Sequence, residues 1–248
     1  MDTPRQGPRA ALAIARQGTH FGLDFLRRRW RPLLLVFVGV LLPLWAFGEL
    51  AEDLHAGEVF FFDAPVLRFV HSLASAGWDG FFVQISGLGY LYGVVPVDAV
   101  LVLVLGYRRR MREGLFAGLT IIGSALLNLG AKHLFARTRP TLWESIAPES
   151  SYSFPSGHAM GSMTLAAVLI LLAWRTRWRW PVLVMAAVFT LLVGLSRIYL
   201  GVHYPSDILA GWTAALVWTV GMYALVFRES RPWQALVDVT NPPRTTPR

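Results

Sequence analysis

Residues 94–105 of this 248-residue chain, VVPVDAVLVLVL, indicate the class of fold. Apart from Asp98, this stretch is apolar on every side of a helix, so it has no polar face to turn toward water. Apolar residues make up 54% of the whole chain and charged residues only 15%, against about 25% charged residues in an ordinary soluble domain. We therefore expect an all-α membrane protein, with the buried core helices of a soluble protein as the alternative.

The chain contains six apolar runs of roughly the 17 to 25 residues that a helix needs to cross the hydrocarbon core. They are residues 33–48, 81–107, 114–131, 159–174, 181–200 and 208–227. The sequence thus predicts a polytopic domain with six transmembrane helices over residues 33–228. An Arg-rich segment, 1–32, precedes it, and a tail, 229–248, that we expect to be partly disordered follows it. The first run is not an obvious cleaved signal peptide.

The positions of the cations predict the orientation. Seven arginines lie in the N-terminal segment, four in residues 108–112, three in 175–179 and four from residue 228 onward, which together are 18 of the 23 cations. With six spans these segments fall on one side, and the positive-inside rule makes that side the cytoplasm. We expect a multi-pass protein of the inner (plasma) membrane with both termini in the cytoplasm.

The opposite face is poor in cations. It keeps Arg68, Lys132, Arg137, Arg139 and Arg197, and it carries six acids, Glu49, Glu52, Asp53, Glu58, Asp63 and Asp79. The net charge of +8 therefore does not indicate a nucleic-acid partner. The chain has no cysteine, which excludes disulfides, iron–sulfur clusters and a cysteine nucleophile.

Three short elements at the outer ends of spans three to six carry candidate chemistry. The first is Lys132, the only lysine, with Arg139-Pro140 following it. On a helix their spacing is two turns, which would place both cations on one stripe, although Pro140 disfavours helix at Arg139. Two cations at a helix end can also be a snorkelling pair without further function.

The second element is Pro155-Ser156-Gly157-His158, at the start of the fourth span. A helix N-terminus exposes unpaired backbone N–H groups beside the positive end of the helix dipole, and this geometry binds anions. A turn of this kind is also a common helix cap, and His158 is the residue that suggests a further role.

The third element is Ser196-Arg197, followed by His203 and Asp207. A cation inside an apolar run is costly without a compensating anion or cavity. Pro205 suits the first turn of the sixth span, so Asp207 can accept a hydrogen bond from one ring nitrogen of His203 and leave the other facing outward. The alternative is a helix-capping pair without chemistry. Together the three elements predict a site for a phosphoryl group.

These residues resemble the signature of the type 2 phosphatidic acid phosphatase family. Lys132 with Arg139-Pro140, Pro155-Ser156-Gly157-His158, and Ser196-Arg197 with His203 and Asp207 match eleven fixed positions in order between residues 132 and 207. The six-span layout extends the resemblance to roughly residues 30–228, and neither tail is covered.

The resemblance implies a membrane enzyme that hydrolyses lipid phosphates or pyrophosphates without a metal or other cofactor. Lys132, Arg139 and Arg197 would hold the phosphate oxygens, with help from Ser156 and the Gly157 N–H. His203, oriented by Asp207, would attack phosphorus and form a phosphohistidine. His158 would protonate the leaving oxygen.

The substrate remains the more open part of this prediction. We expect undecaprenyl diphosphate first, with phosphatidic acid or phosphatidylglycerophosphate as alternatives, and the oligomeric state stays open. Vanadium haloperoxidases share the signature, although six spans argue against that activity. A transporter would need an intramembrane charge such as Asp98, for which we expect instead a structural hydrogen bond or a packing role. The complete signature disfavours a purely structural protein.

Overall fold

The computed structural model describes residues 30, 34, 36–228, 232 and 233, and all regular secondary structure among them is helical. The π-helical turn η1 (Phe37–Leu41) leads into α2 (Leu42–His55), and the short helix α3 (Asp63–His71) follows. The remaining helices are α4 (Ala76–Leu88), α5 (Val94–Tyr107), α6 (Met111–Phe135), α7 (Gly157–Ala173), α8 (Arg179–Tyr199) and α9 (Pro205–Val226). The all-α prediction is confirmed for these residues, whereas the predicted tails lie almost wholly outside them.

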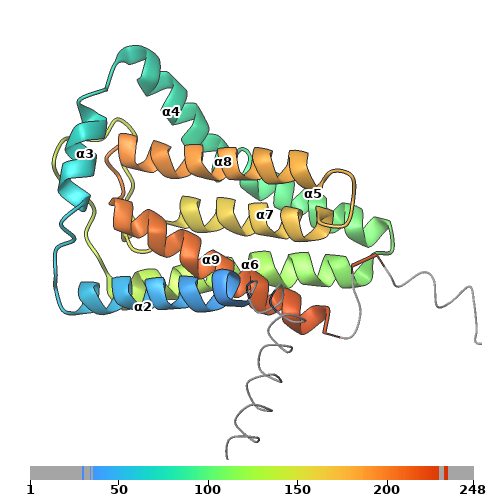
Figure 1. Cartoon of the computed structure of the whole chain (residues 1–248). Coiled ribbons are helices and arrows are strands. Elements are labelled where there is room, and N and C mark those ends of the chain that lie inside the picture. The colour runs from blue at the N-terminus through green and yellow to red at the C-terminus, as the bar shows by residue number, and fades with distance from the viewer. Residues whose placement is uncertain (1–29, 31–33, 35, 229–231, 234–248) are drawn as a thin grey trace, which may run out of the picture.

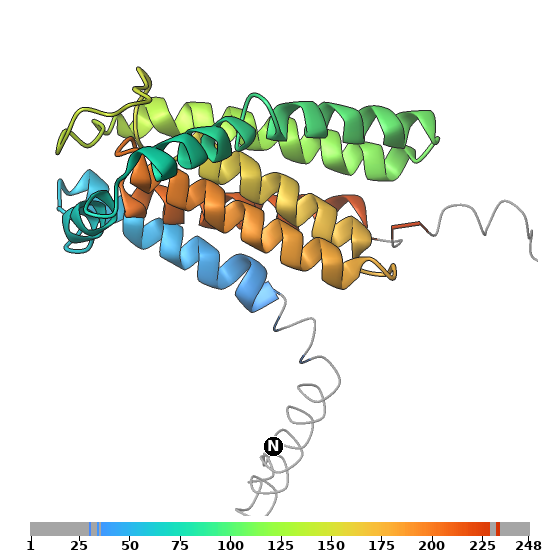
Figure 2. The ribbon, with the colours of Figure 1, turned by 90° about the horizontal axis from the view of Figure 1, so that it is seen from above.

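Helix α7 is at the centre of the bundle (Figure 1). It packs against α5, α6, α8 and α9, and α2 lies along α9. The short helix α3 packs across the ends of α8 and α9 at one end of the bundle. Figure 2 shows α5 and α6 side by side along one edge of the molecule. An apolar cluster consisting of Leu105, Phe116, Ala117, Val168, Leu172, Met222 and Phe227 fills the end of the bundle away from α3.

The outer surface of the bundle is apolar. Helices α6, α8 and α9 are long and apolar enough to cross a membrane, and α5 and α7 are shorter apolar helices. Large aliphatic side chains remain exposed along α6 and α8, among them Leu119, Ile122, Leu126, Val184, Val188 and Leu191. A surface of this kind is unfavourable in water and favourable against lipid.

The predicted second span is two helices rather than one. Helix α4 ends at Leu88 and α5 begins at Val94. In the turn between them, a Cβ atom on Gly93 would lie 2.2 Å from the carbonyl oxygen of Leu88, so the close approach requires glycine. Because the turn residues Leu91 and Tyr92 are themselves largely apolar, hydropathy gives no sign of this interruption.

The two ends of the bundle differ in charge. The Arg-rich turns between α5 and α6 and between α7 and α8 lie at the end opposite α3 (Figure 1). The loop of residues 136–156, between α6 and α7, lies at the α3 end together with Asp63 and Asp79. The fold therefore separates the cations of the Arg-rich turns from the end where the three motifs meet.

Candidate active site

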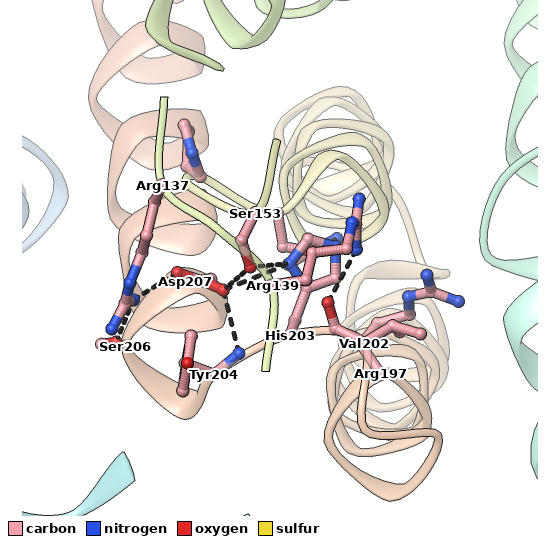
Figure 3. A network of polar contacts seen from close by, with 12 residues as sticks. Arg137, Arg139, Ser153, Arg197, Val202, His203, Tyr204, Ser206 and Asp207 are labelled. Carbon is pink, nitrogen blue, oxygen red and sulfur yellow. Dashed lines mark hydrogen bonds and ion pairs between the residues drawn. The ribbon is translucent and has the colours of Figure 1, made fainter. Parts of the chain in front are cut away.

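Four helix ends meet at the α3 end of the bundle. Helices α6 and α8 end there, α7 and α9 begin there, and the 136–156 loop crosses them. Figure 3 shows that side chains from this loop, from the connection between α8 and α9 and from the start of α9 point toward one another, with Arg197 of α8 nearby. All three sequence elements are therefore brought into one region.

The turn containing Ser156 is fixed against the start of α9. Ser156 is the N-cap of α7, and its buried Oγ accepts a hydrogen bond from the Ala159 N–H (3.5 Å). The Ser156 N–H donates to the carbonyl oxygen of Asp207 (3.1 Å). A Cβ atom on Gly211 would lie 2.8 Å from the Ser156 carbonyl oxygen, so α9 approaches this turn very closely. The N-terminus of α7, with Gly157 and His158 in its first turn, is thus held at the site.

His203 lies between α8 and α9, and only 1% of its surface is exposed. Its Nδ1 is 3.3 Å from Oδ2 of Asp207, and its Nε2 is 3.1 Å from Nη1 of Arg139 (Figure 3). Nε2 is therefore the ring nitrogen that faces the cations. Burial lowers the pKa of His203 to about 4, although the hydrogen bond to Asp207 acts in the opposite direction. The imidazole is consequently neutral at neutral pH.

Asp207 is fully buried at the third position of α9 and is held by several donors. Its Oδ2 accepts hydrogen bonds from the Tyr204 N–H (2.9 Å) and from Ser153 Oγ (2.5 Å). Its Oδ1 accepts from Nη1 of Arg137 (2.5 Å). These contacts fix the carboxylate that orients His203.

Arg137 is a site residue that the sequence analysis did not assign. Besides Asp207 it contacts Asp63 of α3 (2.9 Å) and Ser206 Oγ (2.7 Å). Its guanidinium also lies 4.0 Å from the ring centroid of Tyr204. Asp63 in turn accepts hydrogen bonds from both the N–H and the Oγ of Ser206. The only sequence signal for Arg137 was its place among the few cations of the acidic face.

Lys132 and Arg139 meet through the loop rather than along one helix. Helix α6 ends at Phe135, and Ala136 adopts a left-handed conformation with φ of 45°. The expectation of one helical stripe is therefore wrong, and the break falls before Arg139, as Pro140 indicates. Lys132 Nζ donates to Ser151 Oγ (3.2 Å), and Arg139 Nε donates to the Ser151 carbonyl oxygen (2.7 Å).

Arg197 is almost completely buried near the end of α8, with 2% of its surface exposed. Its guanidinium forms an ion pair with Glu149 of the loop and donates a hydrogen bond to Ser86 of α4. The other oxygen of the Glu149 carboxylate is 2.6 Å from Nη2 of Arg139. Glu149 therefore bridges the two arginines that the sequence analysis placed around a phosphate.

The charge of Glu149 is stabilised by its position. Burial by itself raises the pKa of Glu149, but the guanidinium groups of Arg197 and Arg139 outweigh this effect and lower the pKa to about 2. The carboxylate is thus an anion at neutral pH. No sequence pattern assigns a role to Glu149, because a loop acid without a regular spacing to other residues gives no signal.

His158, in the first turn of α7, lies beside the Glu149 carboxylate. Its Nδ1 is 3.8 Å from Oε1 of Glu149, and its ring lies 5.2 Å from that of Tyr90. The second predicted histidine therefore faces the same centre as Arg139 and Arg197. Among the described residues, no group of three or more His, Asp or Glu side chains is placed to hold a metal ion.

The fold and the site define a membrane protein whose described residues form a helical bundle, with arginine, lysine and histidine side chains gathered at one end of it. Residues 113–231 match the PAP2 superfamily. The chain is 30% identical over 156 residues to the undecaprenyl-diphosphatase of Sulfolobus acidocaldarius, covering 61% of this chain and 72% of that protein. The chain belongs to the PAP2 superfamily.

Two further comparisons agree with this assignment. The chain is 28% identical over 176 residues to phosphatidylglycerophosphatase B of Bacillus subtilis, covering 69% of this chain and 86% of that protein. The crystal structure of a transmembrane PAP2-type phosphatidylglycerolphosphate phosphatase from Bacillus subtilis matches with a TM-score of 0.68 at 26% identity. The match covers 76% of this chain and 98% of that one.

Proposed function

We propose that this protein hydrolyses a lipid phosphate or pyrophosphate at the extracytoplasmic face of the inner membrane. Undecaprenyl diphosphate is the first substrate we propose, and phosphatidylglycerophosphate is the second, because relatives carry both activities in their names. These relatives are phosphatases, which favours hydrolysis over the haloperoxidase alternative. In this proposal the chain has six spans with both termini in the cytoplasm, as the 18 arginines of the four basic segments indicate.

The position of His203 carries the proposal. Its Nδ1 faces Asp207 while its Nε2 faces Arg139, so the ring is oriented with one nitrogen toward the place where anions bind. Nε2 attacks phosphorus, the bond from phosphorus to the leaving oxygen breaks, and His158 donates a proton to that oxygen. Water then attacks the phosphohistidine and releases phosphate.

The cations supply the charge stabilisation that this reaction requires. Lys132, Arg139 and Arg197 hold the nonbridging oxygens, together with Ser156 and the Gly157 N–H at the start of α7. In phosphoryl transfer the protein mainly positions groups and stabilises charge, so we propose that three cations suffice without a metal.

A lipid chain has a place beside this site. A cavity of about 690 Å³ adjoins Pro155 and Met160 and is bounded by apolar residues of α2, α6 and α9, including Phe47, Leu127 and Trp218. An apolar cavity next to a cationic site suits a substrate that combines a phosphate with a hydrocarbon chain.

The test is phosphate release by the purified protein in detergent. A panel of undecaprenyl diphosphate, phosphatidylglycerophosphate and phosphatidic acid would be measured with and without EDTA, and the His203→Ala protein, purified in parallel, is the control. We expect release from at least one lipid that persists in EDTA and is inhibited by vanadate. Release from none of them would overturn the proposed function, and loss in EDTA that magnesium restores would overturn the metal-independent mechanism.

A further inference from the structure

A cavity of about 560 Å³ extends from the cationic site into the bundle between α5, α6 and α7. Its lining at the site includes Lys132, Glu149 and His158. Its lining farther along the helices includes Asp98 of α5, Ser124 of α6 and Thr164 of α7. Unlike the apolar cavity beside Pro155, this one therefore has polar groups along its length.

Asp98 is the unexplained group in this cavity. Its Oδ1 is buried and has no hydrogen-bond partner, and it is the only carboxylate oxygen of the described residues in that condition. The structural hydrogen bond that the sequence analysis expected for Asp98 is therefore not made at this oxygen. Because an unpaired polar atom among apolar helices is costly, the position indicates a partner that the chain itself does not supply.

Three other polar residues that line the cavity along α6 and α7, Ser124, Asn128 and Thr164, make hydrogen bonds within the chain. Ser124 Oγ and Thr164 Oγ1 are 2.7 Å apart, and Thr164 Oγ1 donates to the Met160 carbonyl oxygen (2.8 Å). Asn128 Nδ2 donates to the Pro155 carbonyl oxygen (3.1 Å). Among the described residues that line this cavity, the buried side-chain atom without a partner is therefore Oδ1 of Asp98.

Asp98 lies close enough to the cationic site for a substrate whose phosphate is bound there to reach it. Gly161 follows His158 by one turn of α7, and a Cβ atom on Gly161 would lie 3.8 Å from Val94 of α5. Asp98 follows Val94 by four residues, or about 6 Å along the axis. Because helical side chains lean toward the N-terminus, the Asp98 side chain leans back toward the site.

We propose that this cavity binds a hydroxyl-bearing part of the leaving group, with the Asp98 carboxyl group accepting a hydrogen bond from that hydroxyl. The inference rests on the proposed lipid phosphatase function and narrows its substrate class. Of the two substrates proposed above, it favours phosphatidylglycerophosphate, whose phosphate is carried by a glycerol unit, over undecaprenyl diphosphate, whose leaving group has no alcohol hydroxyl. The hydrocarbon chain itself then occupies the apolar cavity beside Pro155.

A pair of substrates that differ in one hydroxyl tests this assignment. The pair is phosphatidylglycerophosphate and the analogue in which propane-1,3-diol replaces the terminal glycerol. A site built to bond a hydroxyl discriminates against the analogue that lacks it, so wild-type protein should show a kcat/KM ratio of at least about tenfold in favour of the hydroxylated lipid. Because the ratio compares two substrates on one protein sample, partial misfolding of a variant cancels.

Two substitutions of Asp98 and one control separate recognition from structure. Asp98→Leu removes the acceptor and should bring the ratio to about one, whereas Asp98→Asn keeps a carbonyl acceptor and should retain most of the preference. The control is Thr219→Val. Thr219 Oγ1 is also a buried oxygen without a hydrogen-bond partner, but Thr219 does not line the cavity, so its replacement should leave the ratio unchanged.

The outcomes distinguish this inference from the function on which it rests. Hydrolysis of both lipids with equal kcat/KM by wild-type protein would overturn the hydroxyl site and leave the phosphatase function standing. A wild-type preference that Asp98→Leu does not change would also overturn it. Absence of hydrolysis of both members of this pair and of every lipid in the panel would instead overturn the proposed function.

Discussion

The Glu149 carboxylate forms an ion pair with the guanidinium of Arg197, and its second oxygen lies 2.6 Å from Nη2 of Arg139. A loop carboxylate thus occupies the two arginines that we propose as phosphate ligands. Carboxylate and phosphate are both anions with oxygen acceptors, so they compete for the same donors. Substrate binding therefore requires Glu149 to leave at least one of its partners.

Replacing Glu149 should strengthen the binding of simple oxyanions. In Glu149→Gln the internal competitor loses its charge, so we expect the inhibition constants of inorganic phosphate and vanadate to fall by about tenfold, which corresponds to about 1.4 kcal/mol. Competitive inhibition of p-nitrophenyl phosphate hydrolysis measures this. Glu144→Gln, in the same loop but outside these ion pairs, is the matched control. Unchanged or higher constants for Glu149→Gln would show that the carboxylate does not compete with phosphate.

The two histidines should respond differently to the leaving group. His203→Ala removes the nucleophile and should abolish hydrolysis of every substrate. His158→Ala removes the proton donor, which is worth about 10² to 10⁴ in rate for a poor leaving group and much less for nitrophenolate. Lipid phosphate and p-nitrophenyl phosphate would be compared for both variants.

Asp207→Asn provides the intermediate case for the same assay. It loses the carboxylate that contacts His203 at 3.3 Å but keeps the nucleophile, so its activity should lie between those of the two histidine variants. Equal losses for His158→Ala and His203→Ala on both substrates would contradict the division of roles. Retention of activity by the His203 variant alone would reverse the assignment, with His158 as the nucleophile and His203 as the proton donor.

The pH dependence of kcat/KM should have its acid limb far below the usual range of histidine. Burial lowers the pKa of His203 from 6.5 to about 4. Because the nucleophile acts in its neutral form, a lowered pKa keeps the imidazole active as the pH falls, and activity declines only near pH 4. Two aryl phosphates with different phosphate pKa values distinguish the limb of the pH profile that comes from the enzyme from the limb that comes from the substrate. Only the limb due to ionisation of the substrate moves between the two compounds. An enzyme limb at 6.5 would contradict the neutral, buried imidazole.

The orientation in the membrane can be tested with single cysteines, since the chain has none. Thr141 lies in the 136–156 loop at the site end, and Thr176 lies in the turn between α7 and α8 at the opposite end. An impermeant thiol reagent applied to intact cells should label Thr141→Cys and miss Thr176→Cys. Permeabilised cells are the control in which both should react. Labelling of position 176 alone in intact cells would place the site in the cytoplasm.

Local patterns in the sequence determined the helices and the motif positions. Pro205 and Asp207 predict the start of α9, and Ser156 predicts the cap of α7, because capping depends on residues within one turn. The apolar runs predict the long helices for the same reason, since the hydrophobic period is a local property. The contact between His203 and Asp207 was also predictable, because their spacing of four residues brings them together at a helix start.

The other residues of the site come together only when the bundle packs. Glu149 reaches Arg197 from 48 positions away in the chain, and Arg137 links Asp63 of α3 to Asp207 across separations of 74 and 70 residues. The path of a loop depends on the surfaces it crosses, so spacing along the chain does not encode it. The break between α4 and α5 escaped prediction because an apolar turn has the same hydropathy as an apolar helix. Local sequence patterns therefore sufficed for the long helices and for the places of the three motifs on them, whereas the packing of the bundle brings Glu149 to the arginines and turns Asp98 toward a cavity.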